Sequence, residues 1–121
     1  VGIIPFFPLE SGFLTGKYRR GETAPEGARL TGSPRGDKLL TDANFDILEQ
    51  LDRFAQEREH SLLDLAIAGL AAQPAVASII TGATSPEQVV ANAASAEWVL
   101  SGEDRDALDA IVASPHPARR R

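Results

Sequence analysis

The sequence has 121 residues, 43% hydrophobic and 24% charged, which is typical of a globular domain with one small core. It contains no cysteine, so disulfides and thiolate metal sites are excluded, and its two histidines are too far apart for a local metal motif. No apolar run approaches the roughly 20 residues that a membrane span needs. We expect a cytoplasmic protein without a bound metal.

The net charge of -5 conceals a basic segment. Residues 17–38 hold six Lys or Arg against three acidic residues, whereas residues 39–118 hold three Arg against thirteen acidic residues. The basic segment is either a solvated loop or a loop that meets a phosphate-bearing ligand. Nucleic acid is disfavoured because the acidic remainder of the chain would repel it.

The N-terminal third predicts one strand and much loop. VGIIPFF at residues 1–7 is apolar and predicts a strand, although Pro5 cannot donate to a ladder. PLESGFLTGKY at 8–18 predicts a turn with room for one helical turn. Gly and Pro recur without periodicity over 19–40, which predicts a long basic loop.

Helical patterns begin after Thr41. Hydrophobic residues then recur at spacings of three, which predicts a helix capped by Thr41 or Asp42. Residues 62–72 are apolar nearly all round and predict a helix buried on most sides. Ser61 and Asp64 occupy the positions of a capping box at its start.

The C-terminal third predicts a second strand at 76–81, a helix from 85 to about 96 and another helix from 101. A flexible tail is expected at 114–121. The residues predicted to face inward on these two helices are Val89, Val90, Ala93, Leu108, Ile111 and Val112.

Strands and helices in this order are typical of an α/β protein with a parallel sheet covered by helices. Two parallel strands cannot hide both faces and both edges of a sheet. The chain also opens on VGIIPFF without a methionine, which favours the interior of a longer protein over a start that was processed away. We therefore expect residues 1–121 to be one part of a larger barrel.

GATSPEQ contains a helix start suited to an anion. Ser85 is a good N-cap, Pro86 suits the first helical position, and Gln88 completes an S-x-x-Q box. The free N–H groups of such a start favour an anion, and Gly82 and Ala83 keep side chains away. A plain helix cap is the alternative.

PLESGFLTGKY offers a second anion-binding turn. Gly12 and Gly16 permit close backbone approach, Ser11 and Thr15 supply hydroxyls, and Lys17 supplies a cation. The spacing is not that of a P-loop. In a parallel barrel, both turns would lie at the carboxyl ends of neighbouring strands, where the last two strands often hold a phosphate.

PFFPLESGFLTGKYRRGETAPEGARL at 5–30 and ITGATSPEQVVANAASAEWVLSGEDRDALDAI at 80–111 resemble the C-terminal part of aldo-keto reductases, of the bacterial branch related to potassium-channel β subunits. The resemblance covers nearly the whole chain. It implies the last two βα units and terminal helices of a (β/α)8 TIM barrel. It also implies NADP(H) at the barrel mouth and NADPH-dependent reduction of aldehydes and ketones to alcohols.

The resemblance further implies a set of cofactor-binding residues. They are Phe6 at the nicotinamide, Pro8, Leu9, Glu10, Ser11 and Gly12 along the pyrophosphate, Lys17 and Arg29 over the phosphates, Gly82, Ala83 and Thr84 at the 2'-phosphate, and Gln88 and Asn92 beside the adenosine. Glu10 stands where a small residue is usual, and Ala91 where many relatives carry a glutamate. NADPH is expected over NADH, although the stronger cationic side chains that some relatives place near Gly82 are missing here.

No catalytic residue is predicted in this chain, because the resemblance implies a catalytic Asp, Tyr, Lys and His from earlier strands. Tyr18 neighbours Lys17, but its context matches the phosphate turn. The implied partners are the N-terminal remainder of the barrel and a small carbonyl substrate, with no nucleic acid or membrane, and a homo-oligomer is left open. The alternatives are a nucleotide-sensing, non-catalytic regulatory subunit and an inactive truncated fragment.

Overall fold

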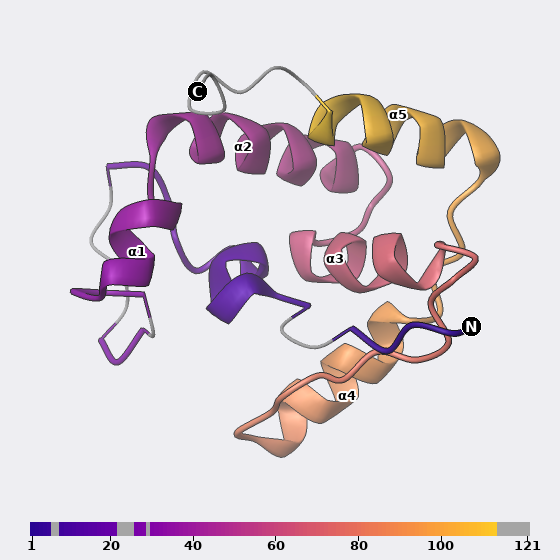
Figure 1. The fold of residues 1–121 in the computed structure, drawn as a ribbon, viewed down its shortest axis with the longest axis horizontal. Helices are drawn as coiled ribbons and strands as arrows, with labels where there is room; N and C mark the ends of the chain where they lie inside the picture. The colour runs from indigo at the N-terminus through magenta and orange to yellow at the C-terminus, as the bar shows by residue number, and fades with distance from the viewer. Residues whose placement is uncertain (6–7, 22–25, 29, 114–121) are drawn as a thin grey trace.

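The computed structural model describes residues 1–5, 8–21, 26–28 and 30–113, and these residues form one 3₁₀ helix and five α-helices. The helices are η1 (Glu10–Thr15), α1 (Pro34–Leu39), α2 (Asp42–Gln56), α3 (Leu62–Ala71), α4 (Pro86–Ser95) and α5 (Gly102–Val112). Helix α3 lies in the middle and contacts η1, α2 and α4, while α5 packs on α2 (Figure 1). Within the described part of the chain, no helix is long and apolar enough to traverse a bilayer.

Each α-helix begins after a Ser or Thr whose side-chain oxygen accepts a hydrogen bond from a backbone N–H three residues later. These N-caps are Ser33, Thr41, Ser61, Ser85 and Ser101. The last four confirm the predicted helix starts, including the capping box of Ser61 and Asp64. Helix α1 was not predicted, because the Gly and Pro residues around it obscured its Ser-Pro start.

The core consists of two clusters along α2, and α3 contributes to both. One cluster joins η1, α2 and the start of α3, and its buried residues are Phe13, Tyr18, Leu30, Phe45, Leu48 and Leu62. The other joins α2 and α3 and has α5 packed against it, and its buried residues are Phe54, Ala55, Leu65, Ala68 and Leu100. The predicted burial of the helix at 62–72 is thus confirmed for most of its large residues.

The strands predicted at 1–7 and 76–81 do not form a sheet among the described residues, so this prediction was wrong as stated. A single parallel bridge joins Ile3 and Val76. The hydrogen bonds between the two segments are Ile3 N to Ala75 O (2.7 Å), Ala77 N to Ile3 O (2.9 Å) and Ile80 N to Pro5 O (3.1 Å). Two parallel segments without further partners give only a marginal ladder, and Pro5 has no N–H to extend it.

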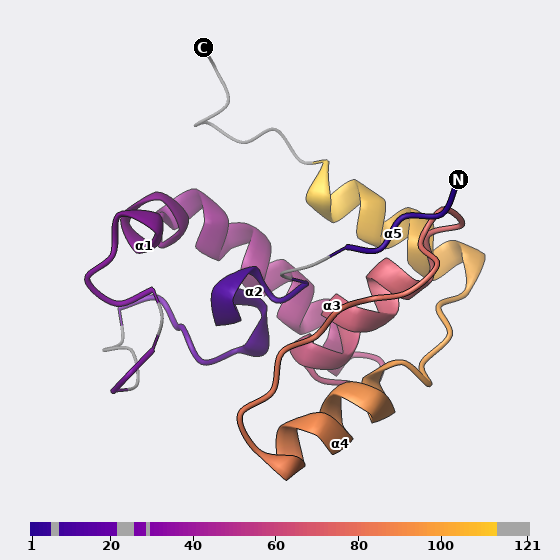
Figure 2. The ribbon, with the colours of Figure 1, turned by 60° about the horizontal axis from the view of Figure 1, so that its bottom comes forward.

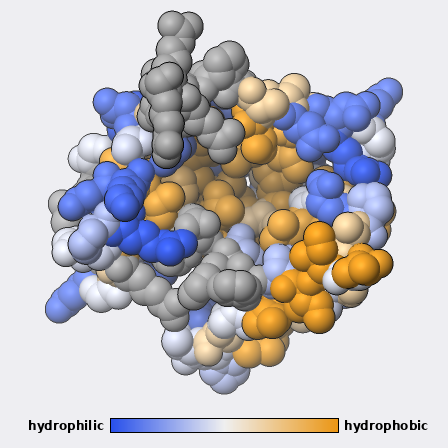
Figure 3. Space-filling model, in the orientation of Figure 1, coloured by the Kyte–Doolittle hydropathy of each residue, from blue (hydrophilic) through white to orange (hydrophobic). Residues whose placement is uncertain are grey.

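These two segments run side by side (Figures 1 and 2). Both segments expose apolar side chains. The exposed residues are Val1, Ile3, Ile4 and Ile80. Figure 3 shows the resulting hydrophobic surface over the N-terminal segment. Large contiguous apolar surface of this kind is unusual on a monomeric protein and marks a place where another element packs.

Helix α4 does not face inward as predicted. The side chains of Val89 and Val90 are 57% and 69% exposed, and Ala93 is exposed too. Helix α4 packs on α3, and its buried residues are the polar Asn92 and Ser95, of which Ser95 bonds to Asp64 on α3. On α5, Leu108 and Ile111 pack against the core as predicted, whereas Val112 is exposed.

Gly36 in α1 is expected to tolerate no side chain. A Cβ at this position would lie 1.9 Å from the carbonyl oxygen of Leu30, so the backbone would have to move. We expect Gly36→Ala to lower the free energy of unfolding in urea by about 1–3 kcal/mol, as overpacking does. The matched control is Gly102→Ala at the start of α5, where no atom lies within 4 Å and stability should hold or rise. Equal effects of the two substitutions would contradict this prediction.

Candidate functional site

A cleft of about 660 Å³ lies where the two predicted anion-binding turns meet. One wall comes from Pro8, Leu9, Gly12, Thr15 and Lys17. The opposite wall comes from Gly82, Ala83, Thr84, Gln88 and Asn92. This volume lies within the range of small-molecule and cofactor sites. Turns that lie about seventy residues apart in the sequence therefore form one concave surface.

The first wall is a glycine turn crossed by a lysine side chain. Gly12 has φ +92°, a conformation that L side chains rarely adopt. A Cβ added to Gly12 would lie 3.0 Å from Cε and 3.1 Å from Nζ of Lys17. The hydroxyl of Thr15 donates to the carbonyl oxygen of Gly12 at 2.7 Å and closes the turn. The Lys17 ammonium thus lies against bare backbone at the cleft.

The second wall is the start of α4, and its cap differs from the predicted box. The N–H of Gln88 donates to Ser85 Oγ at 3.3 Å, as predicted. Gln88 Oε1, however, accepts from the backbone N–H (2.7 Å) and hydroxyl (3.1 Å) of Thr84, one residue before the cap. Asn92 Nδ2 donates to the carbonyl oxygen of Gly82 at 3.3 Å. An anion at this end would have to compete with Gln88 for the Thr84 donors.

Asp64 fixes the second wall to α3. Its Oδ1 accepts from the buried Ser95 hydroxyl at 2.8 Å, and its Oδ2 accepts from the Ser61 N–H at 3.0 Å. Burial raises the pKa of Asp64, but hydrogen bonds from Ser61, Ser95 and His60 outweigh it, so the pKa lies below its ordinary 3.8. His60 stacks on Trp98 with ring centroids 3.9 Å apart. A charged carboxylate therefore anchors α4.

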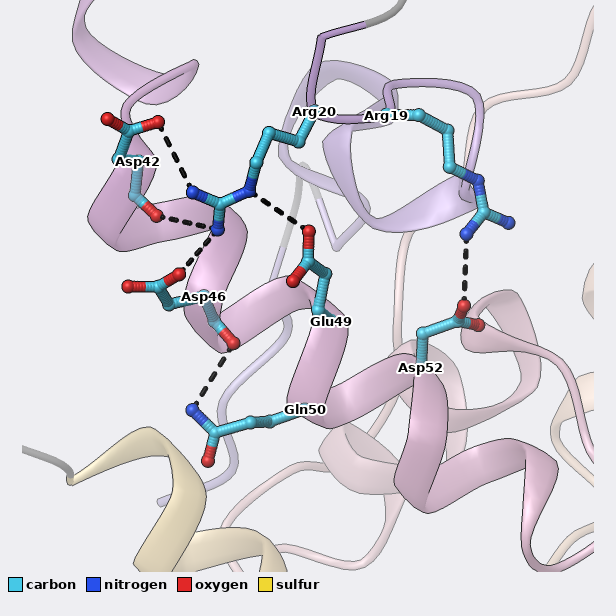
Figure 4. Close-up of polar contacts among 7 residues, drawn as sticks. All are labelled: Arg19, Arg20, Asp42, Asp46, Glu49, Gln50 and Asp52. Atoms are coloured by element: carbon cyan, nitrogen blue, oxygen red, sulfur yellow. Dashed lines mark hydrogen bonds and ion pairs between the residues drawn. The ribbon is translucent and has the colours of Figure 1, made fainter.

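Two arginines of the basic segment do not line the cleft, and their side chains reach carboxylates on α2 instead (Figure 4). Arg19 pairs with Asp52 at 3.1 Å, and Arg20 pairs with Asp42, Asp46 and Glu49, all on α2. The hydrogen bonds to Glu49 and Asp46 raise the pKa of Arg20. Among the described residues, the cleft lining contains one Lys and no Arg, namely Lys17.

Tyr18 belongs to the core. Its side chain is 2% exposed, and its oxygen accepts a hydrogen bond from the backbone N–H of Leu30 at 2.9 Å. The ring packs beside Phe13. Tyr18 does not line the cleft, although its neighbour Lys17 does.

The cleft gathers most of the residues that the sequence singled out for cofactor binding. Those that line it are Pro8, Leu9, Gly12, Lys17, Gly82, Ala83, Thr84, Gln88 and Asn92. Phe6 and Arg29 lie outside the described residues, and Glu10 and Ser11 are described only as backbone of η1.

The set of predicted site residues omitted several lining residues. They are Gly27, Leu63 and Ile80, whereas Thr15 was named for its hydroxyl in the anion-binding turn and Ala91 as a departure from the relatives, and both line the cleft. Leu63 comes from α3, and the only sequence signal for it is that α3 is apolar nearly all round.

The family model of the aldo/keto reductase family matches residues 1–113. The chain belongs to the aldo/keto reductase family. It is 39% identical over 97 residues to an L-glyceraldehyde 3-phosphate reductase of Escherichia coli O157:H7, a match that covers 76% of this chain and 28% of that protein. It is 34% identical over 118 residues to a "probable voltage-gated potassium channel subunit beta" of Oryza sativa subsp. japonica, with 94% and 36% covered.

A solved structure of the same family shares the fold. A glycerol dehydrogenase of Gluconobacter oxydans matches with a TM-score of 0.73 and 25% identity, over 93% of this chain and 34% of that chain. The chain thus spans about a third of the length of the relatives that it matches.

Asp64 is expected to make stability depend on acid pH. The pKa of Asp64 is lowered in the folded state. Its contribution to the free energy of unfolding is therefore fully present above the ordinary pKa of Asp, and it is lost as the pH falls through the lowered pKa. We expect Asp64→Asn to lower the free energy of unfolding by about 1–2 kcal/mol at pH 7 and to reduce the further loss below about pH 4. Urea unfolding at several pH values measures both effects.

The control for this prediction is Asp106→Asn, which removes an exposed carboxylate on α5. It should leave the pH dependence of stability close to that of the wild type. If Asp64→Asn loses as much stability as the wild type does between pH 7 and acid pH, Asp64 is not the source of the acid dependence.

Proposed function

We propose that the chain is the cofactor-binding part of an NADPH-dependent reductase that converts aldehydes and ketones to alcohols. The observation that carries the proposal is the cleft that brings the Gly12–Lys17 turn and the start of α4 together. Membership of the aldo/keto reductase family and relatives named as reductases support the reaction class. A cytoplasmic location is part of the same proposal.

The two walls suit the two ends of a dinucleotide. We assign the pyrophosphate to the turn of Pro8, Leu9, Glu10, Ser11 and Gly12, with Lys17 and Arg29 over the phosphates and Phe6 at the nicotinamide. We assign the 2'-phosphate to Gly82, Ala83 and Thr84, and the adenosine to Gln88 and Asn92. The bound cofactor supplies a hydride. The bare backbone at Gly12 and the ammonium beside it fit a phosphate.

We also propose that the chain forms the last two βα units of a (β/α)8 barrel whose earlier strands carry the catalytic groups. The parallel hydrogen bonds between the first segment and residues 75–80 support this. The exposed Val89 and Val90 and the apolar N-terminal segment support it as well, since such surfaces need a partner. The N-terminal remainder of the barrel would cover them.

The reaction is tested on the complete protein that carries this chain. We expect loss of NADPH absorbance in the presence of small aldehydes or ketones. One relative is named an NADH-specific methylglyoxal reductase, so NADH is assayed beside NADPH. Failure of every simple carbonyl with both cofactors would overturn the enzymatic proposal.

The second candidate is a nucleotide-sensing regulatory subunit, which the similarity to a protein named a potassium channel subunit beta favours. The same experiment separates the two. Binding of NADPH without turnover, together with a partner that co-purifies, would support the regulatory role. Turnover would support the reductase.

Lys17 is expected to contribute to dinucleotide affinity whichever cofactor is used, because NADH and NADPH share the pyrophosphate. We expect Lys17→Met to raise the Kd for both by about tenfold or more, the scale of a hydrogen bond to a charged group. The matched control is Lys38→Met, an exposed residue at the end of α1 outside the cleft lining. Isothermal titration measures Kd. Equal affinities of the two variants would refute the assignment of Lys17.

A further inference from the structure

The side chain of Gln88 occupies the hydrogen-bond donors of Thr84 at the cleft. Its Oε1 accepts from the backbone N–H of Thr84 at 2.7 Å and from the Thr84 hydroxyl at 3.1 Å. A backbone N–H only donates, so the oxygen of the Gln88 amide, and not its nitrogen, faces Thr84. Both residues line the cleft and both are exposed, so a ligand in the cleft has access to this pair.

Other donors at this wall are engaged as well. Pro86 at the first position of α4 has no backbone N–H, and the N–H of Gln88 donates to Ser85 Oγ at 3.3 Å. Asn92 Nδ2 donates to the carbonyl oxygen of Gly82 at 3.3 Å. A phosphate at this end of the cleft would therefore depend strongly on the Thr84 donors that Gln88 occupies.

The 2'-phosphate is the group that distinguishes NADPH from NADH. In the site proposed above it lies at residues 82–84, whereas Lys17, the cation of the described cleft lining, belongs to the opposite wall. A phosphate that lacks a cation partner relies on N–H and O–H donors. It must then take the Thr84 donors from Gln88, a cost that NADH, with a hydroxyl in place of the phosphate, does not bear.

We propose that Gln88 is a specificity-determining residue that lowers the preference for NADPH over NADH. In the free protein it satisfies both Thr84 donors, and the 2'-phosphate displaces its amide on binding. NADH leaves the amide in place. The inference deepens the proposed function and rests on it, because it requires a dinucleotide whose 2'-phosphate lies at Thr84.

The test compares the two cofactors in the complete protein. Gln88→Met keeps the length of the side chain and removes its amide. We expect it to lower the ratio of the Kd for NADPH to the Kd for NADH by about three- to tenfold, and the ratio of the two KM values should shift likewise. The ratio is the readout because a loss of stability or a distorted cleft would affect both cofactors alike.

The sign of the shift separates this role from the opposite one. If Gln88 turned its amide nitrogen to the 2'-phosphate and donated to it, removal of the amide would raise the ratio. A ratio that rises or stays unchanged in Gln88→Met, with both cofactors still bound, would overturn the inference and leave the proposed function standing. Wild-type protein that binds neither dinucleotide would overturn the proposed function itself.

A double-mutant cycle links the effect to Thr84. Thr84→Val keeps the shape of the side chain and the backbone N–H but removes the hydroxyl, which is one of the donors that Gln88 occupies. We expect Gln88→Met to shift the ratio less in the Thr84→Val background than in the wild type, because fewer donors are released to the phosphate. An equal shift in both backgrounds would contradict the role of the Thr84 donors and overturn the inference.

Gln73→Met is the matched control. Gln73 is an exposed glutamine that follows α3 and lies outside the cleft lining. The same substitution there should leave the ratio of the two Kd values unchanged. A shift as large as that of Gln88→Met would show that the effect needs no contact with Thr84 and would overturn the inference. Isothermal titration of each variant with NADPH and NADH gives all of these ratios.

Discussion

The burial of α3 on several sides is the constraint on which the rest of the structure depends. Apolar residues of α3 belong to both core clusters, and η1, α2 and α4 all contact this helix. Leu63 on the same helix lines the cleft, so one buried helix holds the turn at Gly12 against the start of α4. Asp64 adds a directional contact, because its hydrogen bond to Ser95 fixes how α4 lies on α3. The site thus follows from core packing.

The local chemistry of the two walls differs, which gives the cleft two distinct ends. The Gly12 wall offers bare backbone and the Lys17 ammonium, so it favours negative charge. At the other wall, Gln88 already accepts from the Thr84 donors. A phosphate there must compete with Gln88 for those donors, whereas a neutral ribose with hydroxyl groups has less need of them. This asymmetry bears on the choice between NADPH and NADH.

Local signals in the sequence predicted the helices well, and long-range pairing accounts for what they missed. The caps at Thr41, Ser61, Ser85 and Ser101 depend on three or four neighbouring residues, and they are confirmed. The orientation of α4 depends instead on whether Ser95 can reach Asp64 on another helix, so the hydrophobic pattern alone misplaced it.

The same distinction holds for the strands and for the candidate site. Residues 1–5 and 75–80 adopt the parallel direction that the pattern predicts, but a ladder needs neighbours on both sides. The sequence predicted the two anion-binding turns from Gly12, Lys17 and Gly82, and in the structure these residues line one cleft. The pairing of Arg20 with α2 joins residues more than twenty positions apart, and composition alone had left the basic segment either as a solvated loop or as a loop that meets a phosphate.

The central claim is that the two turns form a single dinucleotide site. A crystal structure of the complete protein with NADP⁺ bound tests it most directly. The account predicts that the pyrophosphate lies against Gly12 and Lys17 and that the adenosine end lies beside residues 82–92. A dinucleotide bound elsewhere, or turns that do not share one cleft, would contradict the account.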